Sequence, residues 1–367
     1  MVLRQRGSVP ASRTAPEASL TFDPGVAMAD DAVAGLELAE VAGSSEPVAV
    51  RAEALLETLR RFVPFDGAWL ALAAPEVPSY SAGASTDLAD STLAFLAGPQ
   101  PARDIELAGA HRAAPPVSPS DLPFPAVQLP TWAECLLPAG YHEGLGVALF
   151  APGGRHVGFL ALLSGDREPP SQQTRHTLGC LVPVLAHGID PLRSLAAAAR
   201  LVHGATAGVV LHEAGGTEVL PGLHAHALLT AGSPAVAVAR EALAAGQSYT
   251  TFLWPRGGRH APRGHARLTV LAAAEDAPSF LVGTVLVSQP GDLRGLTPRE
   301  LEVLGLLIEG SSNAAISRAL LIAPRTVAAH LEHIMAKLSA RSRTLAAVRA
   351  VREGLYVPRQ EGTPPAS

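Results

Sequence analysis

The most restrictive feature of the sequence is a stretch near its end, from Asn313 to Leu338. Two runs of helix-forming residues are separated there by a four-residue turn, Leu-Ile-Ala-Pro, and the second run begins at Pro324. Four apolar residues of the second run recur at the spacing of one helix face: Val327, Leu331, Ile334 and Leu338. Two short helices joined by such a turn are typical of a helix-turn-helix. We therefore expect one face of the second helix to be packed and the opposite face to be exposed.

A further helix is expected on each side of this pair. The first begins with a capping box, in which Thr297 and Glu300 satisfy each other's backbone amides, and it ends at Gly310. The last helix spans about residues 342–353 and offers three residues for packing, Leu345, Val348 and Val351. Residues 291–358 are thus predicted to form an all-α domain of four helices.

This pattern, about 60 residues long, resembles the LuxR-type helix-turn-helix of bacterial transcription regulators. The matching positions are Asn313, Ile316, Thr326, Val327, His330, Ile334, Lys337 and Leu338. The resemblance implies that the third helix enters the major groove of DNA and that the fourth helix supports dimerisation. It also implies a homodimer on double-stranded DNA, with an operator that is an inverted repeat.

Several positions depart from the family pattern. Ala314 and Ala328 stand where the family usually has lysine, and Glu332 stands where a basic or polar residue is common. Fewer phosphate contacts weaken non-specific binding, whereas Ala328 and Ala329 can contact thymine methyl groups and Glu332 can accept from a cytosine amino group. Ala323 replaces the usual serine cap of the third helix, which costs about 1 kcal/mol of helix stability.

The residues expected to face DNA are Asn313, Arg325, Thr326, Ala328, Ala329, Glu332, His333 and Lys337. Residues 296–355 hold eight Lys or Arg and five Glu, a formal charge of +3, although the whole chain carries −5. A basic segment on an acidic body indicates a division of labour between nucleic-acid binding and other roles.

The region before this domain is predicted to hold two α/β domains. Residues 46–190 read as a helix, a buried strand at 67–74, an irregular proline-rich part at 97–130, a hairpin at 143–166 and a closing helix. This helix is expected to be interrupted near Pro183 and again at Asp190-Pro191. This order is similar to a GAF-like sensor domain. Residues 191–290 read as a second, smaller α/β domain, PAS-like or GAF-like.

The two ends of the chain have little periodicity. Residues 1–45 and 359–367 are expected to be disordered tails, and Met28 is an alternative start to Met1. The predicted fold class is therefore an α/β multidomain chain with a C-terminal four-helix domain.

Four aromatic residues of the GAF-like region are candidates for lining a ligand pocket: Trp69, Trp132, Tyr141 and Phe159. The ligand is not identified by the sequence, and buried aromatic side chains are also ordinary core residues. The helical segment near 171–200 is a candidate dimer stem between the sensor and the DNA-binding end.

Other chemistry receives little support. Cys135 and Cys180 have no ligand spacing, His224 and His226 lack a third ligand, and no phosphate loop or nucleophile arrangement stands out. No apolar run reaches membrane-spanning length. We predict a cytoplasmic DNA-binding regulator that is not an enzyme and has no cofactor or metal. Two alternatives remain, namely a protein-interaction module with a degenerate helix-turn-helix and a thiol redox sensor.

Overall fold

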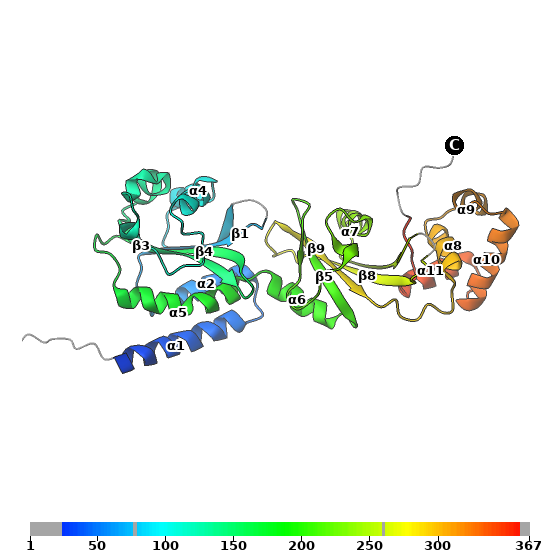
Figure 1. Ribbon diagram of the computed structural model, residues 1–367, viewed down its shortest axis with the longest axis horizontal. Coiled ribbons are helices and arrows are strands. Elements are labelled where there is room, and N and C mark those ends of the chain that lie inside the picture. Colours follow the sequence, from blue (N-terminus) through cyan, green and yellow to red (C-terminus); the bar gives the residue numbers. More distant parts are fainter. Residues whose placement is uncertain (1–23, 76–78, 259–260, 360–367) are drawn as a thin grey trace, which may run out of the picture.

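The computed structural model describes residues 24–75, 79–258 and 261–359. Three bodies follow one another along its longest axis (Figure 1), which we call domain 1 (residues 24–190), domain 2 (residues 191–290) and the head (residues 291–359). The observed α/β domains followed by a helical head agree with the predicted fold class. None of the helices in these described ranges is both long and apolar enough to cross a membrane.

Domain 1 is built on an antiparallel sheet with the strand order β2-β1-β4-β3. The strands are β1 (Gly67–Ala73), β2 (Tyr80–Thr86), β3 (Glu143–Ala151) and β4 (Arg155–Ser164). One face packs against α2 (Val48–Leu59) and α5 (Gln172–Ile189). The other face is covered by the connection that contains α3 (Asp90–Leu96), α4 (Gln100–Leu107) and η3 (Thr131–Leu136). The expected strand and hairpin are present as β1 and as β3 with β4, whereas no strand was predicted at the position of β2.

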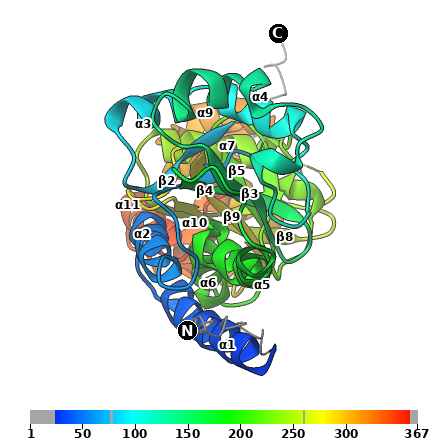
Figure 2. The ribbon, with the colours of Figure 1, turned by 90° about the vertical axis from the view of Figure 1, so that its left-hand side faces the viewer.

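The N-terminal segment differs from the expected disordered tail. Residues 1–23 lie outside the described residues, but Pro24–Gly43 form helix α1, which packs on α2 and α5 (Figure 2). Ala34, Leu38 and Ala42 are fully buried in this contact. A Cβ added at Gly188 of α5 would lie 3.1 Å from the Cβ of Ala42, so the two helices approach closely there. Alanine supplies much of the buried face, which is why its helical periodicity was missed. The other tail, residues 360–367, also lies outside the described residues.

The candidate stem near 171–200 is two helices rather than one. Helix α5 continues through Pro183 and ends at Ile189, so the interruption expected near Pro183 is wrong. The break expected at Asp190-Pro191 is present, and α6 (Leu192–Leu201) packs on the sheet of domain 2. Since α5 lies between α1 and the sheet of domain 1, no continuous stem joins the sensor to the head.

Domain 2 is a five-stranded antiparallel sheet in the order β6-β5-β9-β8-β7. Its strands are β5 (Ala205–His212), β6 (Thr217–Val219), β7 (Tyr249–Pro255), β8 (His265–Ala272) and β9 (Leu281–Ser288). Because neighbouring side chains of a strand point to opposite faces, Val209 packs with α7 (Pro234–Ala244) and Val210 packs with α6. Both faces of this sheet are therefore covered by a helix.

The head contains α8 (Pro298–Ile308), α9 (Asn313–Leu320), α10 (Pro324–Lys337) and α11 (Arg343–Arg352). The stripe predicted on the third helix is buried: Val327, Leu331, Ile334 and Leu338. The packing residues predicted for the last helix are wrong. Helix α11 buries Ala346 and Ala350, whereas Val348 and Val351 are exposed by 43% and 53%. The small alanines let α11 approach α8 closely, and Leu345 is only half-buried.

The burial of α1 predicts an effect of substitution in a segment that looked disordered. Leu38→Ala removes a fully buried side chain and should lower the free energy of unfolding of domain 1 by about 3 kcal/mol. The matched control Leu36→Ala, at a side chain exposed by 74%, should change it by less than about 0.5 kcal/mol. Urea unfolding followed by tryptophan fluorescence in a Trp254→Phe background measures both, and equal effects would contradict the packing of α1.

Candidate functional site

The turn between α9 and α10 is fixed by local hydrogen bonds. Ser312 caps α9 by accepting from the amide of Ala315, and the hydroxyl of Ser317 donates to the carbonyl of Ile322 within the turn. Leu321 ends α9 with φ of 54°, in the left-handed region that a non-glycine residue seldom adopts. Ala323 precedes α10 without a side-chain cap, as its sequence implies. The turn therefore determines where α10 begins.

Helix α10 presents one face of its surface to solvent. Its exposed residues are Arg325, Ala329, Glu332, His333, Ala336 and Lys337, with Thr326 and Ala328 half-buried beside them. Asn313 lies on α9, and its Oδ1 is buried without a hydrogen-bond partner among the described residues. The structure thus brings the expected DNA-facing residues of α10 onto one surface and places Asn313 apart from them.

Lys337 has an intramolecular partner that sequence reasoning missed. Its Nζ donates to Oε2 of Glu300 at 2.7 Å, and the side chain of Glu300 is only 4% exposed. The same carboxylate accepts from the amide of Thr297 and completes the capping box of α8. The ammonium of Lys337 is therefore paired within the head, and this pairing competes with the phosphate contact expected from the sequence.

The carboxylate of Glu300 is held in its charged form. Burial alone would raise its pKa, but the hydrogen bonds from Lys337 and Thr297 outweigh that effect and hold the pKa below its usual value. Nδ1 of His333 lies 3.9 Å from the other oxygen of Glu300. The carboxylate of Glu300 thus binds Lys337 and lies near His333, and both of these residues belong to the C-terminal part of α10.

Arg325 consequently carries the one outward positive charge of α10 that has no ion pair within the described residues. Among the other exposed arginines of the head, which lie outside α10, are Arg318 on α9 and Arg341 and Arg343 near the start of α11. Our list of candidate contacts omitted these three residues, and their exposure was not visible in the sequence pattern.

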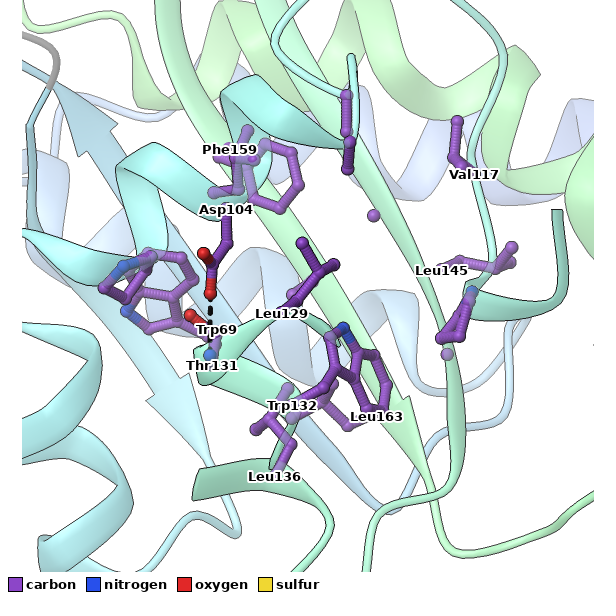
Figure 3. Close-up of a pocket in the computed structure, with 18 of the residues that line it drawn as sticks. Trp69, Asp104, Val117, Leu129, Thr131, Trp132, Leu136, Leu145, Phe159 and Leu163 are labelled. Carbon is purple, nitrogen blue, oxygen red and sulfur yellow. Dashed lines mark hydrogen bonds between the residues drawn. The ribbon is translucent and has the colours of Figure 1, made fainter. Parts of the chain in front are cut away.

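Domain 1 contains a second candidate site, a cavity of about 100 Å3 between its sheet and the connection over it (Figure 3). Of the four aromatic residues expected to line a pocket, three do so, namely Trp69, Trp132 and Phe159. Tyr141 is not among the lining residues. It packs nearby against the group formed by Cys135, Leu136 and Leu163, and its hydroxyl donates to the carbonyl of Asp87 at 2.8 Å.

The wall of this cavity is apolar apart from a few polar groups. Oδ2 of Asp104 accepts from the amide of Thr131 at 2.6 Å, as the dashed line in Figure 3 shows, and Oδ1 accepts from the side chain of Gln100. Oγ1 of Thr131 is buried and has no hydrogen-bond partner among the described residues. A buried hydroxyl without a partner is uncommon in folded proteins. Thr131, a lining residue, therefore carries an unused hydrogen-bonding group beside an apolar, aromatic wall.

The described residues contain no cluster of His, Cys, Asp or Glu suited to a metal ion. His224 and His226 instead make backbone contacts, to the carbonyl of Thr206 and from the amide of Leu228. Cys135 and Cys180 are both free thiols, the first buried and the second exposed. Burial raises the pKa of the Cys135 thiol, which makes it a weaker nucleophile and disfavours its use as a redox sensor.

The comparisons with solved structures give low similarity. A GAF domain of a phosphoenolpyruvate-protein phosphotransferase from Coxiella burnetii is 17% identical, with 47% of this chain and 98% of that chain covered and a TM-score of 0.36. VqmA of Vibrio cholerae, described as a LuxR-type receptor, is 16% identical, with 45% and 90% covered and a TM-score of 0.24. These scores are too low for either likeness to assign a fold to domains 1 and 2.

The sequence comparisons concern the head. LnrK, a transcriptional regulatory protein of Bacillus subtilis, is 42% identical over 77 residues, which are 21% of this chain and 35% of LnrK. The nitrate/nitrite response regulator NarL of Escherichia coli is 38% identical over 65 residues, 18% of this chain and 30% of NarL. The chain thus spans about a third of the length of these relatives. The family model described as bacterial regulatory proteins, luxR family, matches residues 294–350, so the head is a LuxR-type helix-turn-helix domain.

Proposed function

We propose that the protein is a DNA-binding transcriptional regulator whose head reads the major groove through α10. The observation that carries this proposal is the exposed face of α10, held on a buried stripe within a domain that matches the luxR family model. We also propose that the protein is cytoplasmic, because its proposed partner is DNA. Selection of binding sites from randomised duplex DNA tests the proposal, because enrichment of one sequence requires specific reading.

The surface of α10 is suited to close approach rather than to strong charge attraction. Ala329 and Ala336 are small and exposed, so the helix can lie deep in the groove and contact thymine methyl groups. Glu332 is exposed on the same face, where it can accept from a cytosine amino group and repel a misplaced phosphate. We therefore propose readout by methyl contact and one carboxylate.

A homodimer is part of this proposal. Val348 and Val351 leave an apolar strip on α11, and two-fold pairing of helix-turn-helix domains places two recognition helices about 34 Å apart, one turn of DNA. The enriched sequence should then be an inverted repeat. Absence of any enrichment, together with no binding of DNA at low salt, would favour the alternative of a protein-interaction module.

Arg325 and Lys337 should respond differently to substitution. Arg325→Ala should weaken binding to random-sequence duplex DNA and reduce the slope of log affinity against log salt by about one. Lys337→Ala should leave that slope unchanged and destabilise the head by about 2 kcal/mol, because it leaves the buried Glu300 without its cation. Fluorescence anisotropy at several salt concentrations and urea unfolding measure the two effects. A reduced slope for Lys337→Ala at full stability would show that Lys337 contacts DNA after all.

Removing the acidic group from the face of α10 should strengthen binding and broaden sequence choice. Glu332→Lys replaces repulsion of the phosphates by attraction and should raise the affinity for random-sequence DNA about tenfold, because an added phosphate contact releases a counterion. The control Glu275→Lys makes the same charge change on an exposed loop of domain 2. Equal gains from the two variants, measured by anisotropy at one salt concentration, would place Glu332 away from the DNA.

A second function, small-molecule sensing, is favoured by the cavity in domain 1. We propose that it takes an uncharged, flat molecule with one hydrogen-bonding group directed at Thr131, since its aromatic wall matches such a shape. A GAF-like role for domain 1 agrees with this proposal. No catalytic step is proposed for the cavity.

Indole and indene make a matched pair of probes for this cavity, because they share a shape and only indole has an N–H donor. Unmodified protein should bind indole about tenfold more tightly than indene, through donation to Oγ1 of Thr131. Thr131→Val keeps the side-chain shape and should remove that preference. Isothermal titration calorimetry measures both affinities. Equal affinities before substitution would exclude the hydroxyl as a ligand contact.

A further inference from the structure

The chain passes from domain 1 to domain 2 through one acidic residue that has two partners. Oδ1 of Asp190 accepts from the amide of Leu192 at 2.9 Å and so begins α6, the first helix of domain 2. Oδ2 of the same carboxylate accepts from Nη2 of Arg155 at 2.5 Å. Asp190 is buried, and it follows the last residue of α5 directly. The start of domain 2 is therefore tied to the β3–β4 hairpin of domain 1.

Arg155 makes a second contact that reaches domain 2 itself. Its Nε lies 3.0 Å from Oε1 of Glu218 on β6, while Nη2 holds Asp190. A guanidinium presents its donors in a planar fork, so one rigid group can hold two carboxylates in fixed directions. Three residues far apart in the sequence thus form a joint, which we call the Arg155 joint (Arg155, Asp190 and Glu218).

The domain boundary is fixed again at the C-terminal end of α1. Nη1 and Nη2 of Arg193, on α6, donate to the carbonyls of Ala42 and Ser44, the second at 2.9 Å. Phe280 also packs against the apolar cores of both domains. The helix that looked disordered in the sequence therefore takes part in holding domain 2.

Two members of the Arg155 joint, Arg155 and Glu218, line a cavity of about 390 Å3 together with His156, His212 and Phe280, whereas Asp190 is buried. Both ring nitrogens of His212 lack a hydrogen-bond partner among the described residues, although Nε2 lies 3.3 Å from Oε2 of Glu218. Ion pairs that water and salt can reach are weaker than a continuous apolar contact. Loss of the Arg155 joint should therefore loosen this boundary without unfolding either domain, while the contacts of Arg193 and Phe280 remain.

Aromatic contacts connect this joint with the ligand cavity. Phe159 lines the cavity and lies four residues beyond Arg155 on β4. Its ring lies 5.9 Å from that of Tyr80, and the ring of Tyr80 lies 5.8 Å from that of His156, the neighbour of Arg155. A displacement of Phe159 would reach His156 through these ring contacts, and His156 is joined to Arg155 through the backbone of β4.

Domain 2 in turn holds the head. Arg267 on β8 donates to the carbonyls of Pro290 and Glu353, at 2.6 Å and 3.1 Å. The amide of Leu253, on the edge strand β7, donates to the carbonyl of Tyr356 at 2.7 Å, and Leu253 packs into the core of the head. The orientation of domain 2 therefore determines where α10 points.

We propose that Arg155 is a positioning residue that sets the orientation of domain 1 on domain 2, and that the Arg155 joint transmits occupancy of the domain 1 cavity to the head. The orientation part stands on the contacts alone. The transmission part rests on the proposed function, because it uses the cavity as a sensor and α10 as a DNA reader.

Distances between spin labels test the orientation part without DNA. In a Cys180→Ser background, labels at Val127→Cys in domain 1 and Tyr249→Cys in domain 2 replace side chains exposed by 59% and 60%. We expect one narrow distance distribution with Arg155 present. Arg155→Ala should make it at least twofold broader, and Asp190→Asn should broaden it similarly while its Oδ1 still begins α6. Arg60→Ala is the control, since Arg60 pairs with Asp87 inside domain 1.

The transmission part is measured with the same labels and with indole. Indole should shift the mean distance when Arg155 is present and should not shift it in Arg155→Ala, with circular dichroism confirming that both proteins are folded. An unchanged distribution in folded Arg155→Ala would overturn the orientation part. Equal shifts in both proteins would overturn transmission through the joint. Because these measurements contain no DNA, failure of the DNA-binding proposal would appear separately, in the site selection.

Discussion

The arrangement of the head depends on one buried carboxylate, that of Glu300. It satisfies the amide of Thr297 at the start of α8 and accepts from Lys337 at the end of α10, so it ties together the ends of two helices that are 37 residues apart. A buried charge without partners is costly, and each partner here also fixes the direction of the carboxylate. The angle of α10 on α8 is therefore set by a charge as well as by the apolar stripe from Val327 to Leu338.

This dependence makes the stability of the head sensitive to acid. The pKa of Glu300 is lower in the folded head than its ordinary value of 4.5. The Glu300 carboxylate therefore binds a proton more readily in the unfolded chain than in the folded head. Its contribution to the stability of the head is fully present above the ordinary pKa of the carboxyl group and is lost as the pH falls through the pKa in the folded head. At neutral pH the anchor is charged and complete. The cation that completes it is Lys337, so one of the few basic side chains of α10 is paired within the head.

Sequence periodicity predicted what depends on neighbours along the chain. The stripe on α10, the capping box of α8 and the β3–β4 hairpin were all visible because their residues recur at short spacing. Contacts between distant segments were not visible, and these include Lys337 with Glu300, the packing of α1 on α5 and the location of Tyr141 beside the cavity rather than in it. Burial of alanine was underestimated twice. Helix α1 was predicted to be disordered, and the buried alanines of α11 were passed over in favour of Val348 and Val351.

A weakly charged recognition helix places a demand on the rest of the molecule. Electrostatic attraction tolerates imprecise placement because it acts over about 8 Å at physiological salt, whereas methyl contacts and one carboxylate act only at contact distance. Two such helices in a dimer read an inverted repeat only if their separation and angle are fixed. In this chain the position of the head depends on domain 2, to which Arg267 and the segment around Tyr356 attach it. The position of domain 2 relative to domain 1 depends in turn on the Arg155 joint. A small rotation at either boundary would therefore change DNA binding more in this protein than in one whose recognition helix is rich in lysine.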